Sequence, residues 1–314
     1  MIESIWGIAG TQVEPTVNQG QHQVFWVHPS HVNADDANYG TDPNYPLATL
    51  QSLINRTWSP VLSNYDTVYI AGSLTESVAT LDEAVSPSYV QLIGIGPSRY
   101  SPSWQSAAVD EVSLQLNAVG WRVSGIRFLG HASESCVELH HTDVSGDDIA
   151  IRTVIDNCYF DGLIVGLRGI ESHGCYDVWI VNNTFALWHN GGGTAICMET
   201  TTTPLAIPYR NYVIGNVFHD SDNGMVWSSN GSFFMNNIVQ PVGYAYAMTS
   251  AFQTSTVGNP GDDNIVTGNV LPGDYALAGL LYRGGAADVW LGNLSDDVAD
   301  GNVGDNGWTI SRPS

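Results

Sequence analysis

The feature that most constrains the fold is a degenerate repeat in the C-terminal two-thirds of the chain. In one copy, Val178–Phe185, an apolar segment meets Asn182 and Asn183 before a second apolar segment begins. The residue at the Asn182 position is Gly or Asn in every copy, and these residues readily adopt the left-handed backbone region. Each unit therefore predicts two short strands joined by a left-handed bend. The positions equivalent to Asn183 are Ile126, Cys158, Asn216, Asn237, Asn269 and Asn293.

The spacing of these units, 21 to 33 residues, indicates a solenoid. A propeller blade needs four strands and about 40 residues, and a helical repeat needs a period of 3.6. Stacked β coils would place the reference positions above one another at about 4.8 Å per coil. Their side-chain amides could then bond along the stack as an asparagine ladder. We therefore expect an all-β, single-stranded parallel β-helix with a structural ladder at Asn183, Asn216, Asn237, Asn269 and Asn293.

These residues resemble the right-handed parallel β-helix of the pectin-lyase-like superfamily, with its asparagine ladder and aromatic stack. The resemblance covers roughly residues 24–295 and is specific for fold rather than function. The order D-x-N-x-G-T-D-P, then P-x-A-T-L-Q, also resembles the opening of many β-helix proteins, where a helix caps the stack. The predicted division is an N-terminal arm at 1–23, the β-helix at 24–295, and a C-terminal cap or arm at 296–314. Within the β-helix we expect a cap helix at about 46–55, a loop at 97–111 and regular coils at about 112–295.

Composition limits the partners of this chain. Its 314 residues carry a net charge of −22, so nucleic acid and anionic membrane surfaces are poor partners. Lysine is absent, which removes it as a catalytic base or Schiff-base former. No apolar run approaches the ~18 residues of a membrane span, and residues 1–20 lack the pattern of a signal peptide. The chain is therefore expected in a virion that leaves the cell by lysis, with an extracellular location as the alternative.

The four cysteines are spaced by roughly one coil and form no CxxC pair, so a zinc cluster is not expected. We expect small buried hydrophobic side chains. Disulfides between neighbouring coils are the alternative. The residues are Cys136, Cys158, Cys175 and Cys197.

Three inserts distinguish the long coils from the short ones: Asp143–Asp148, Thr200–Pro208 and Thr254–Asp263. All precede the strand that leads to the bend, so they would project from one flank of the stack. Loops on a rigid scaffold commonly carry binding residues. The alternative is that the aromatic residues there pack the coils. The candidate binding flank is Thr200, Thr201, Tyr209, Trp188 and Tyr246.

Catalytic candidates come from a resemblance to polygalacturonase-type glycosidases. Asp147 and Asp148 resemble their paired aspartates, His173 their histidine, and Arg210 a substrate-binding arginine. The flanking Asn-Thr-Asp and Arg-Ile-Lys motifs are missing, so the set is incomplete.

A calcium-dependent lyase is the other enzyme option. Its Ca²⁺ would be held by the aspartate pair above together with Asp262 and Asp263. Gly-Asp-Asp occurs at both places, which favours a turn motif. Asp35, Asp36 and Asp42 are also interpreted as turn-forming acids rather than calcium ligands. No cofactor is therefore expected, with Ca²⁺ as the possible exception.

The incomplete catalytic set favours a non-enzymatic protein. β-Helices of this kind resemble phage tailspikes, fibres and capsid-decorating proteins, which are usually trimeric. The resemblance implies a virion surface protein, a homotrimer, whose N-terminal arm contacts other virion proteins and whose flank binds a cell-surface polysaccharide. The alternative is a polysaccharide-degrading enzyme, either a glycoside hydrolase or a calcium-dependent lyase.

Overall fold

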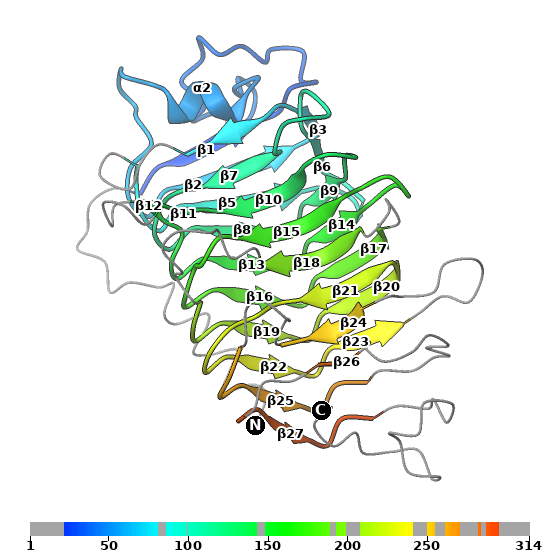
Figure 1. Ribbon diagram of the computed structural model, residues 1–314. Helices are drawn as coiled ribbons and strands as arrows, with labels where there is room; N and C mark the ends of the chain where they lie inside the picture. Colours follow the sequence, from blue (N-terminus) through cyan, green and yellow to red (C-terminus); the bar gives the residue numbers. More distant parts are fainter. Residues whose placement is uncertain are drawn as a thin grey trace.

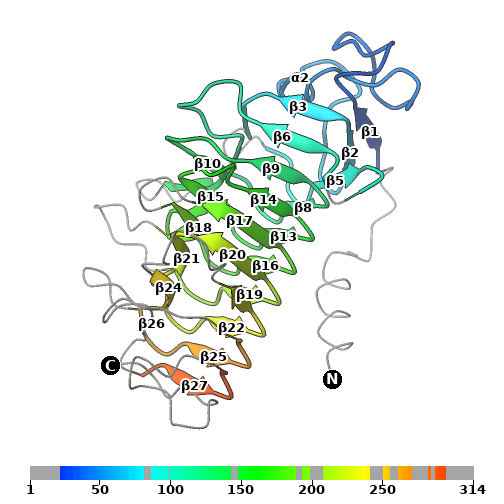
Figure 2. The same cartoon turned by 90° about the vertical axis from the view of Figure 1, so that its right-hand side faces the viewer.

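Three parallel sheets wind into a right-handed β-helix in the computed structural model (Figures 1 and 2). The structure describes residues 22–294 apart from 81–85, 99, 143–147, 189–192, 199–207, 241–249, 255–260, 271–281 and 284–286. Each coil passes from sheet A through a bend to sheet B, then to sheet C, and returns to sheet A. The predicted fold class is confirmed.

Sheet A has ten strands in spatial order: β1 (Val24–Val27), β2 (Thr67–Ala71), β5 (Gln91–Ile95), β8 (Arg122–Ser124), β13 (Val154–Asp156), β16 (Trp179–Val181), β19 (Tyr212–Ile214), β22 (Phe233–Met235), β25 (Ile265–Thr267) and β27 (Val289–Leu291). Sheet B has seven: β3 (Ser73–Thr75), β6 (Ser103–Gln105), β9 (Arg127–Leu129), β14 (Tyr159–Asp161), β17 (Thr184–Trp188), β20 (Val217–Ser221) and β23 (Ile238–Gln240).

Sheet C has eight strands: β4 (Val78–Ala79), β7 (Leu114–Leu116), β10 (Ser135–Leu139), β15 (Arg168–Ser172), β18 (Thr194–Met198), β21 (Asn223–Val226), β24 (Ser250–Gln253) and β26 (Tyr282–Arg283). A short antiparallel pair, β11 (His141–Thr142) with β12 (Asp148–Ile149), lies outside the three sheets.

The corner between sheets A and B is built by the bend predicted from the sequence. All seven Gly or Asn positions of this bend have positive φ, between 53° and 70°. The next residue points inward, and its amide joins the coils. Asn183 donates from its backbone N and from Nδ2 to Oδ1 of Asn216, at 2.9 and 3.1 Å. The same pattern continues through Asn237 and Asn269 to Asn293.

A second corner of the same design, between sheets C and A, was not predicted. Here too one residue per coil has positive φ, and the residue after it is buried. In the later coils this buried residue is polar and links the coils. Asn211 donates from its backbone N to Ser232 Oγ, and the backbone N of Ser232 donates to Asn264 Oδ1. Asn264 in turn donates to Asp288. From β19 to β25, each sheet A strand is therefore held between two bends and two rows of polar links.

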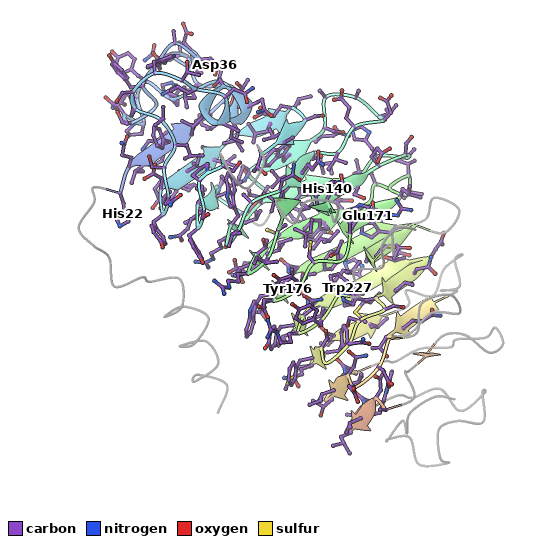
Figure 3. All side chains as sticks on the ribbon, turned by 60° about the vertical axis from the view of Figure 1, so that its left-hand side comes forward. His22, Asp36, His140, Glu171, Tyr176 and Trp227 are labelled. Carbon is purple, nitrogen blue, oxygen red and sulfur yellow. The ribbon has the colours of Figure 1, made fainter. Side chains whose placement is uncertain are left out.

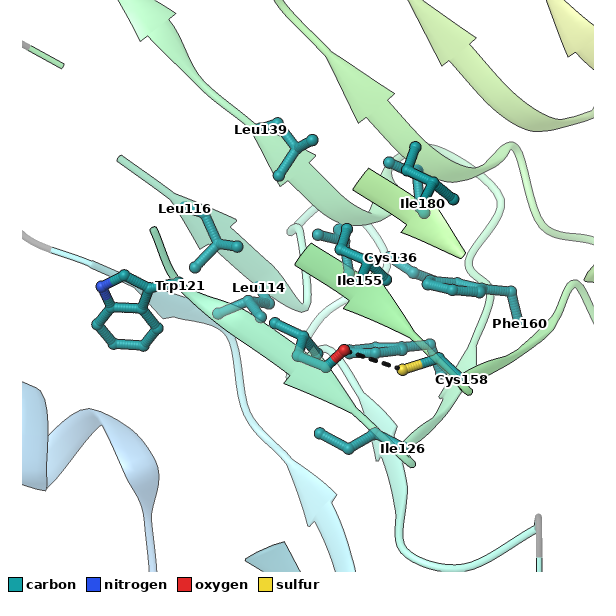
Figure 4. Close-up of a cluster of buried hydrophobic side chains, with 14 of the residues drawn as sticks. Leu114, Leu116, Trp121, Ile126, Cys136, Leu139, Ile155, Cys158, Phe160 and Ile180 are labelled. Carbon is teal, nitrogen blue, oxygen red and sulfur yellow. Dashed lines mark hydrogen bonds between the residues drawn. The ribbon is translucent and has the colours of Figure 1, made fainter. Parts of the chain in front are cut away.

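An aromatic stack lines sheet B, whereas sheet A contributes mainly aliphatic side chains together with Phe25, Phe234 and Trp290; Figure 4 shows part of this core. Trp104, Phe128, Phe160, Phe185 and Phe218 stack with ring centroids 4.7 to 5.5 Å apart. Each ring is fully buried, which is worth about 1.5–3 kcal/mol per side chain. In the coils of the four phenylalanines, an inward ring two residues after the ladder position thus fixes the register.

The N-terminal end is covered by helix α2 (Leu50–Ile54), which lies within the predicted cap at 46–55. Thr49 is its N-cap, and the Asp36 carboxylate accepts hydrogen bonds from the backbone N of Ala48 and Thr49. Asp35 and Asp42 form local turns, in which each carboxylate accepts a hydrogen bond from the backbone N two residues later. Among the described residues, no helix is long and apolar enough to cross a membrane.

The prediction of a loop at 97–111 was wrong. Residues Ser103–Gln105 form β6, which pairs with β3 and β9, and Trp104 is fully buried. Pro97 and Pro102, which both precede this strand, suggested irregular backbone, but inward packing of the indole decides the conformation. Coils that share the three sheets therefore begin before residue 112.

Candidate functional site

The outward row of sheet C carries a cluster of charged and polar side chains on neighbouring strands β10 and β15. The strands pair in register, so Glu138 lies beside Glu171 and Ser135 beside Arg168. His140 and His173 follow the two strands, with ring centroids 5.7 Å apart. We call the following residues the polar cluster, of which His140 and Glu171 are labelled in Figure 3: Ser135, Glu138, His140, Arg168, Glu171 and His173.

Contacts between coils hold this cluster together. His173 Nε2 lies 2.8 Å from Glu138 Oε1 and 3.8 Å from Glu171 Oε1, so one imidazole nitrogen faces two carboxylates. Arg168 Nη1 lies 3.0 Å from Glu171 Oε1, and Ser135 Oγ donates to Glu171 Oε2. The His173 side chain is 13% exposed, so it is recessed yet reaches solvent. Such a set can bind hydroxyl groups in a fixed geometry or exchange a proton with them.

Charge and burial act in opposite directions on these carboxylates. Burial raises the pKa of Glu138, but the hydrogen bond from His173 and the positive charges of His173, His140 and Arg168 outweigh it. The net pKa of Glu138 is lowered from its ordinary value of 4.5. The pKa of Glu134 is raised, first by burial and then by the negative charges of Glu171 and Glu138. The surroundings therefore favour the ionised form of Glu138.

The described residues include only part of the catalytic set suggested by the sequence. His173 belongs to the polar cluster. Arg210 lies at the C–A corner, where its Nε and Nη2 form a bidentate salt bridge with the carboxylate oxygens of Asp177, both at 2.9 Å. Asp147 lies outside the described residues, and Asp148 is placed only as part of strand β12. The contacts that His173 makes are instead with glutamates that the motif comparison did not single out.

Trp188 was wrongly predicted to line a binding flank. Its side chain is 0% exposed. Its ring fills the space left by the missing side chains of Gly130, Gly162 and Gly166, since a Cβ at Gly166 would lie 2.6 Å from the ring. The coil-packing alternative is correct for this residue.

Tyr209 is 40% exposed, as a binding residue requires, but its ring stacks on Tyr176 at 4.6 Å. Thr200, Thr201 and Tyr246 lie outside the described residues.

The calcium candidates Asp262 and Asp263 serve the second corner. Asp263 is a bend residue with φ of 56°, and Asp262 Oδ1 accepts a hydrogen bond from the backbone N of Ala287. In the described part of the chain, no three His, Cys, Asp or Glu side chains are grouped as metal ligands.

The four cysteines are free thiols, as the packing interpretation predicted, and three of them are buried. Cys158 Sγ lies 3.6 Å from the Val123 carbonyl oxygen inside the core (Figure 4). Burial raises the pKa of the Cys158 and Cys175 thiols to about 12. These side chains pack the coils and are not nucleophiles.

The register and corners define the class of the protein as a parallel β-helix with a polar cluster on one flank. No protein-family model matches the chain, and no curated protein matches it. Among solved structures, it is similar to a tailspike protein of Escherichia coli bacteriophage HK620 in complex with a hexasaccharide: 14% identity, TM-score 0.45, 73% of this chain and 44% of that one. It is also similar to PfbA, a surface adhesin of Streptococcus pneumoniae: 10% identity, TM-score 0.47, 74% of this chain and 77% of that one. The chain thus spans less than half the length of the tailspike.

Proposed function

We propose that this chain is a glycan-binding attachment protein, non-enzymatic, whose polar cluster on sheet C contacts a cell-surface polysaccharide. The observation that carries the proposal is the pre-arranged group of Glu138, Glu171, His173 and Arg168, held by the Arg168–Glu171 pair within one coil and by the His173–Glu138 and Ser135–Glu171 contacts between two coils. Sugar hydroxyls bond to carboxylates, imidazoles and guanidinium groups. Because the chain carries a net charge of −22, a neutral or amino sugar suits it better than a polyuronate.

The wider setting of the proposal is the surface of a phage virion, as a capsid-decorating or tailspike-like component. In this setting the protein acts as a homotrimer, and the N-terminal arm contacts other virion proteins. An extracellular surface is the alternative location. Deleting residues 1–20 and measuring incorporation into particles tests the setting. Unchanged incorporation, or the absence of any particle, contradicts it.

Binding is tested on an array of bacterial surface polysaccharides, with the wild type and Glu171→Gln compared at equal concentration. Loss of a charged hydrogen bond costs about 1.5–3 kcal/mol, which is roughly 10- to 150-fold in Kd. Asp263→Asn is the matched control, because it also removes one carboxylate, lies at the C–A corner and keeps a residue that tolerates positive φ. Binding that is equal in the wild type and Glu171→Gln contradicts a role for the cluster.

A second candidate is a glycoside hydrolase, since two carboxylates that flank a reacting bond are the usual requirement of that chemistry. Glu138 and Glu171 both face His173, and they are the pair to test. Release of reducing ends from a bound polysaccharide by the wild type, abolished in Glu138→Gln, would favour the enzyme. Binding without release favours the attachment protein. Release that requires Ca²⁺ and yields unsaturated uronates would instead indicate a lyase.

A further inference from the structure

The outer face of sheet A differs from the rest of the surface because its C-terminal half is uncharged. Strands β16, β19, β22, β25 and β27 each contribute two outward residues, and none of the ten is Asp, Glu, Arg or His. Most are aromatic or aliphatic, and the Leu291 side chain is 60% exposed. Contiguous apolar surface of this kind marks an interaction site more often than a bare surface.

The aromatic rings on this face are arranged for a flat partner. Trp179 and Tyr212 stack with centroids 3.8 Å apart and planes at 9°, and Tyr212 and Phe233 follow at 5.1 Å and 1°. Since the rings cover one another's faces, the surface presents their edges. A sugar needs a free ring face, so this row suits a protein surface rather than a glycan.

The adjoining C–A corner has the composition of an interface. Arg152, Asp177 and Arg210 occupy its bend position on three successive coils, so charges of both signs alternate along one column. Tyr176 and Tyr209 stack beside them, and the Arg210 side chain is 55% exposed. Tyr and Arg are enriched among the residues that dominate binding energy.

Charge and size together point to the occupant. Two copies that each carry a net charge of −22 repel one another, so they approach best through a face without charge. At the corner, Arg210 and Asp177 neutralise one another within the chain, so this pair adds no repulsion between two copies. The ten strands of sheet A at about 4.8 Å, each about 15–20 Å wide with its corner, give a face on the order of 800 Å², which is what each partner buries in a standard interface, and the five uncharged strands make up about half of it.

We propose that the outer face of sheet A, together with the C–A corner, binds a second copy of this chain. A basic partner would be drawn to the acidic surface elsewhere and would gain little from this face. The inference rests on the proposed function in one respect, because the attachment protein proposed above is an oligomer. It does not depend on glycan binding, because the polar cluster belongs to another sheet.

The test is sedimentation of the full-length protein over a micromolar concentration range, with polysaccharide binding measured on the same samples. Tyr212→Glu places a charge in the middle of the face and is expected to weaken self-association at least about 100-fold. Leu291→Glu, at the exposed end of the face, is expected to weaken it about tenfold without risk to the core. Val217→Glu is the matched control, since it places the same charge on an outward position of the same coil but in sheet B.

A wild type that stays monomeric overturns the inference even if it binds glycan. So does a folded Tyr212→Glu or Leu291→Glu protein that associates like the wild type, or a Val217→Glu control that is equally weakened. A wild type that self-associates through this face but binds no polysaccharide contradicts only the proposed function. Circular dichroism of each variant identifies any that fail to fold.

Discussion

The outer faces of sheets A and C carry opposite chemistry on successive coils of one stack, because the uncharged strands of sheet A begin at β16, directly after the polar cluster on β10 and β15 of sheet C. Sheet A presents stacked rings and aliphatic side chains, whereas sheet C presents two glutamates, two histidines and an arginine on neighbouring strands. Strand spacing and parallel register are the same in both. The difference shows that inward residues and corners determine the coil, while outward residues are free to determine what the coil contacts.

The largest expected effect comes from an inward residue that both faces depend on. Trp188→Ala leaves a cavity beside three glycines and is expected to lower the free energy of unfolding by about 3–5 kcal/mol, measured in urea. Tyr209→Ala is the control on an exposed ring and should cost less than about 1 kcal/mol. Equal effects would contradict the assignment of Trp188 to the core.

The next effect separates the ladder from the bend. Asn183→Leu leaves the backbone N–H of Cys158 without its acceptor and removes the Nδ2 bonds to Asn216 Oδ1 and the Ile155 carbonyl oxygen, so a loss of about 2–4 kcal/mol is expected. Asn182→Gly keeps a residue suited to φ of 54° and should change stability by less than about 0.5 kcal/mol. Thermal unfolding measures the stability of both variants. Similar losses of stability in Asn183→Leu and Asn182→Gly would contradict the separate roles of ladder and bend.

A smaller effect distinguishes the two faces by pH. The folded-state pKa of Glu138 is lowered, so the stability that it contributes is present above its ordinary pKa of 4.5 and is lost as pH falls through the lowered value. Glu138→Gln should therefore be less stable than the wild type at neutral pH and lose less on acidification. Urea midpoints between pH 7 and pH 3 measure this. Tyr212→Phe, on sheet A, should leave the acid dependence unchanged.

The smallest effect concerns the reactivity of the thiols, which lie away from the outer faces of sheets A and C. With pKa values of about 12, Cys158 and Cys175 should not react with a disulfide reagent at pH 8 until the protein unfolds. Cys197, which is only half-buried, should react first. Mass spectrometry of the labelled native protein locates the modified residue. Rapid labelling of Cys158 in the folded protein would contradict the described core.

The sequence predicted the first corner because its signal is chemically narrow. Only Gly and Asn occupy that bend, and Asn recurs at the inward position, so the period could be recognised. At the second corner the bend residue is Gly at some coils but Arg or Asp at others, as at Arg152, Asp177, Arg210 and Asp263, and the inward residue varies even more. There the backbone conformation is imposed by the coils on both sides rather than by local preference.

The polar cluster was missed for a different reason. Glu138 and Glu171 are far apart in sequence and belong to no motif, and only the register of β10 with β15 brings them together. Searching for chemically matched residues one coil apart would have found both this pair and His140 with His173. The motif search instead reached His173 and proposed other partners for it.

The hydrogen bonds of the first polar row run in both directions along the stack. From Asn183 to Asn269, each Nδ2 donates to Oδ1 of the next rung and to a backbone carbonyl oxygen of the preceding coil. A single amide thus bonds to the coil on either side of it, and the row is a continuous seam rather than a set of separate pairs. In the second row, Asn264 likewise donates forward to the carboxylate of Asp288 and backward to the Ser229 carbonyl oxygen. The loss of one rung is therefore expected to loosen both neighbouring coils as well as its own.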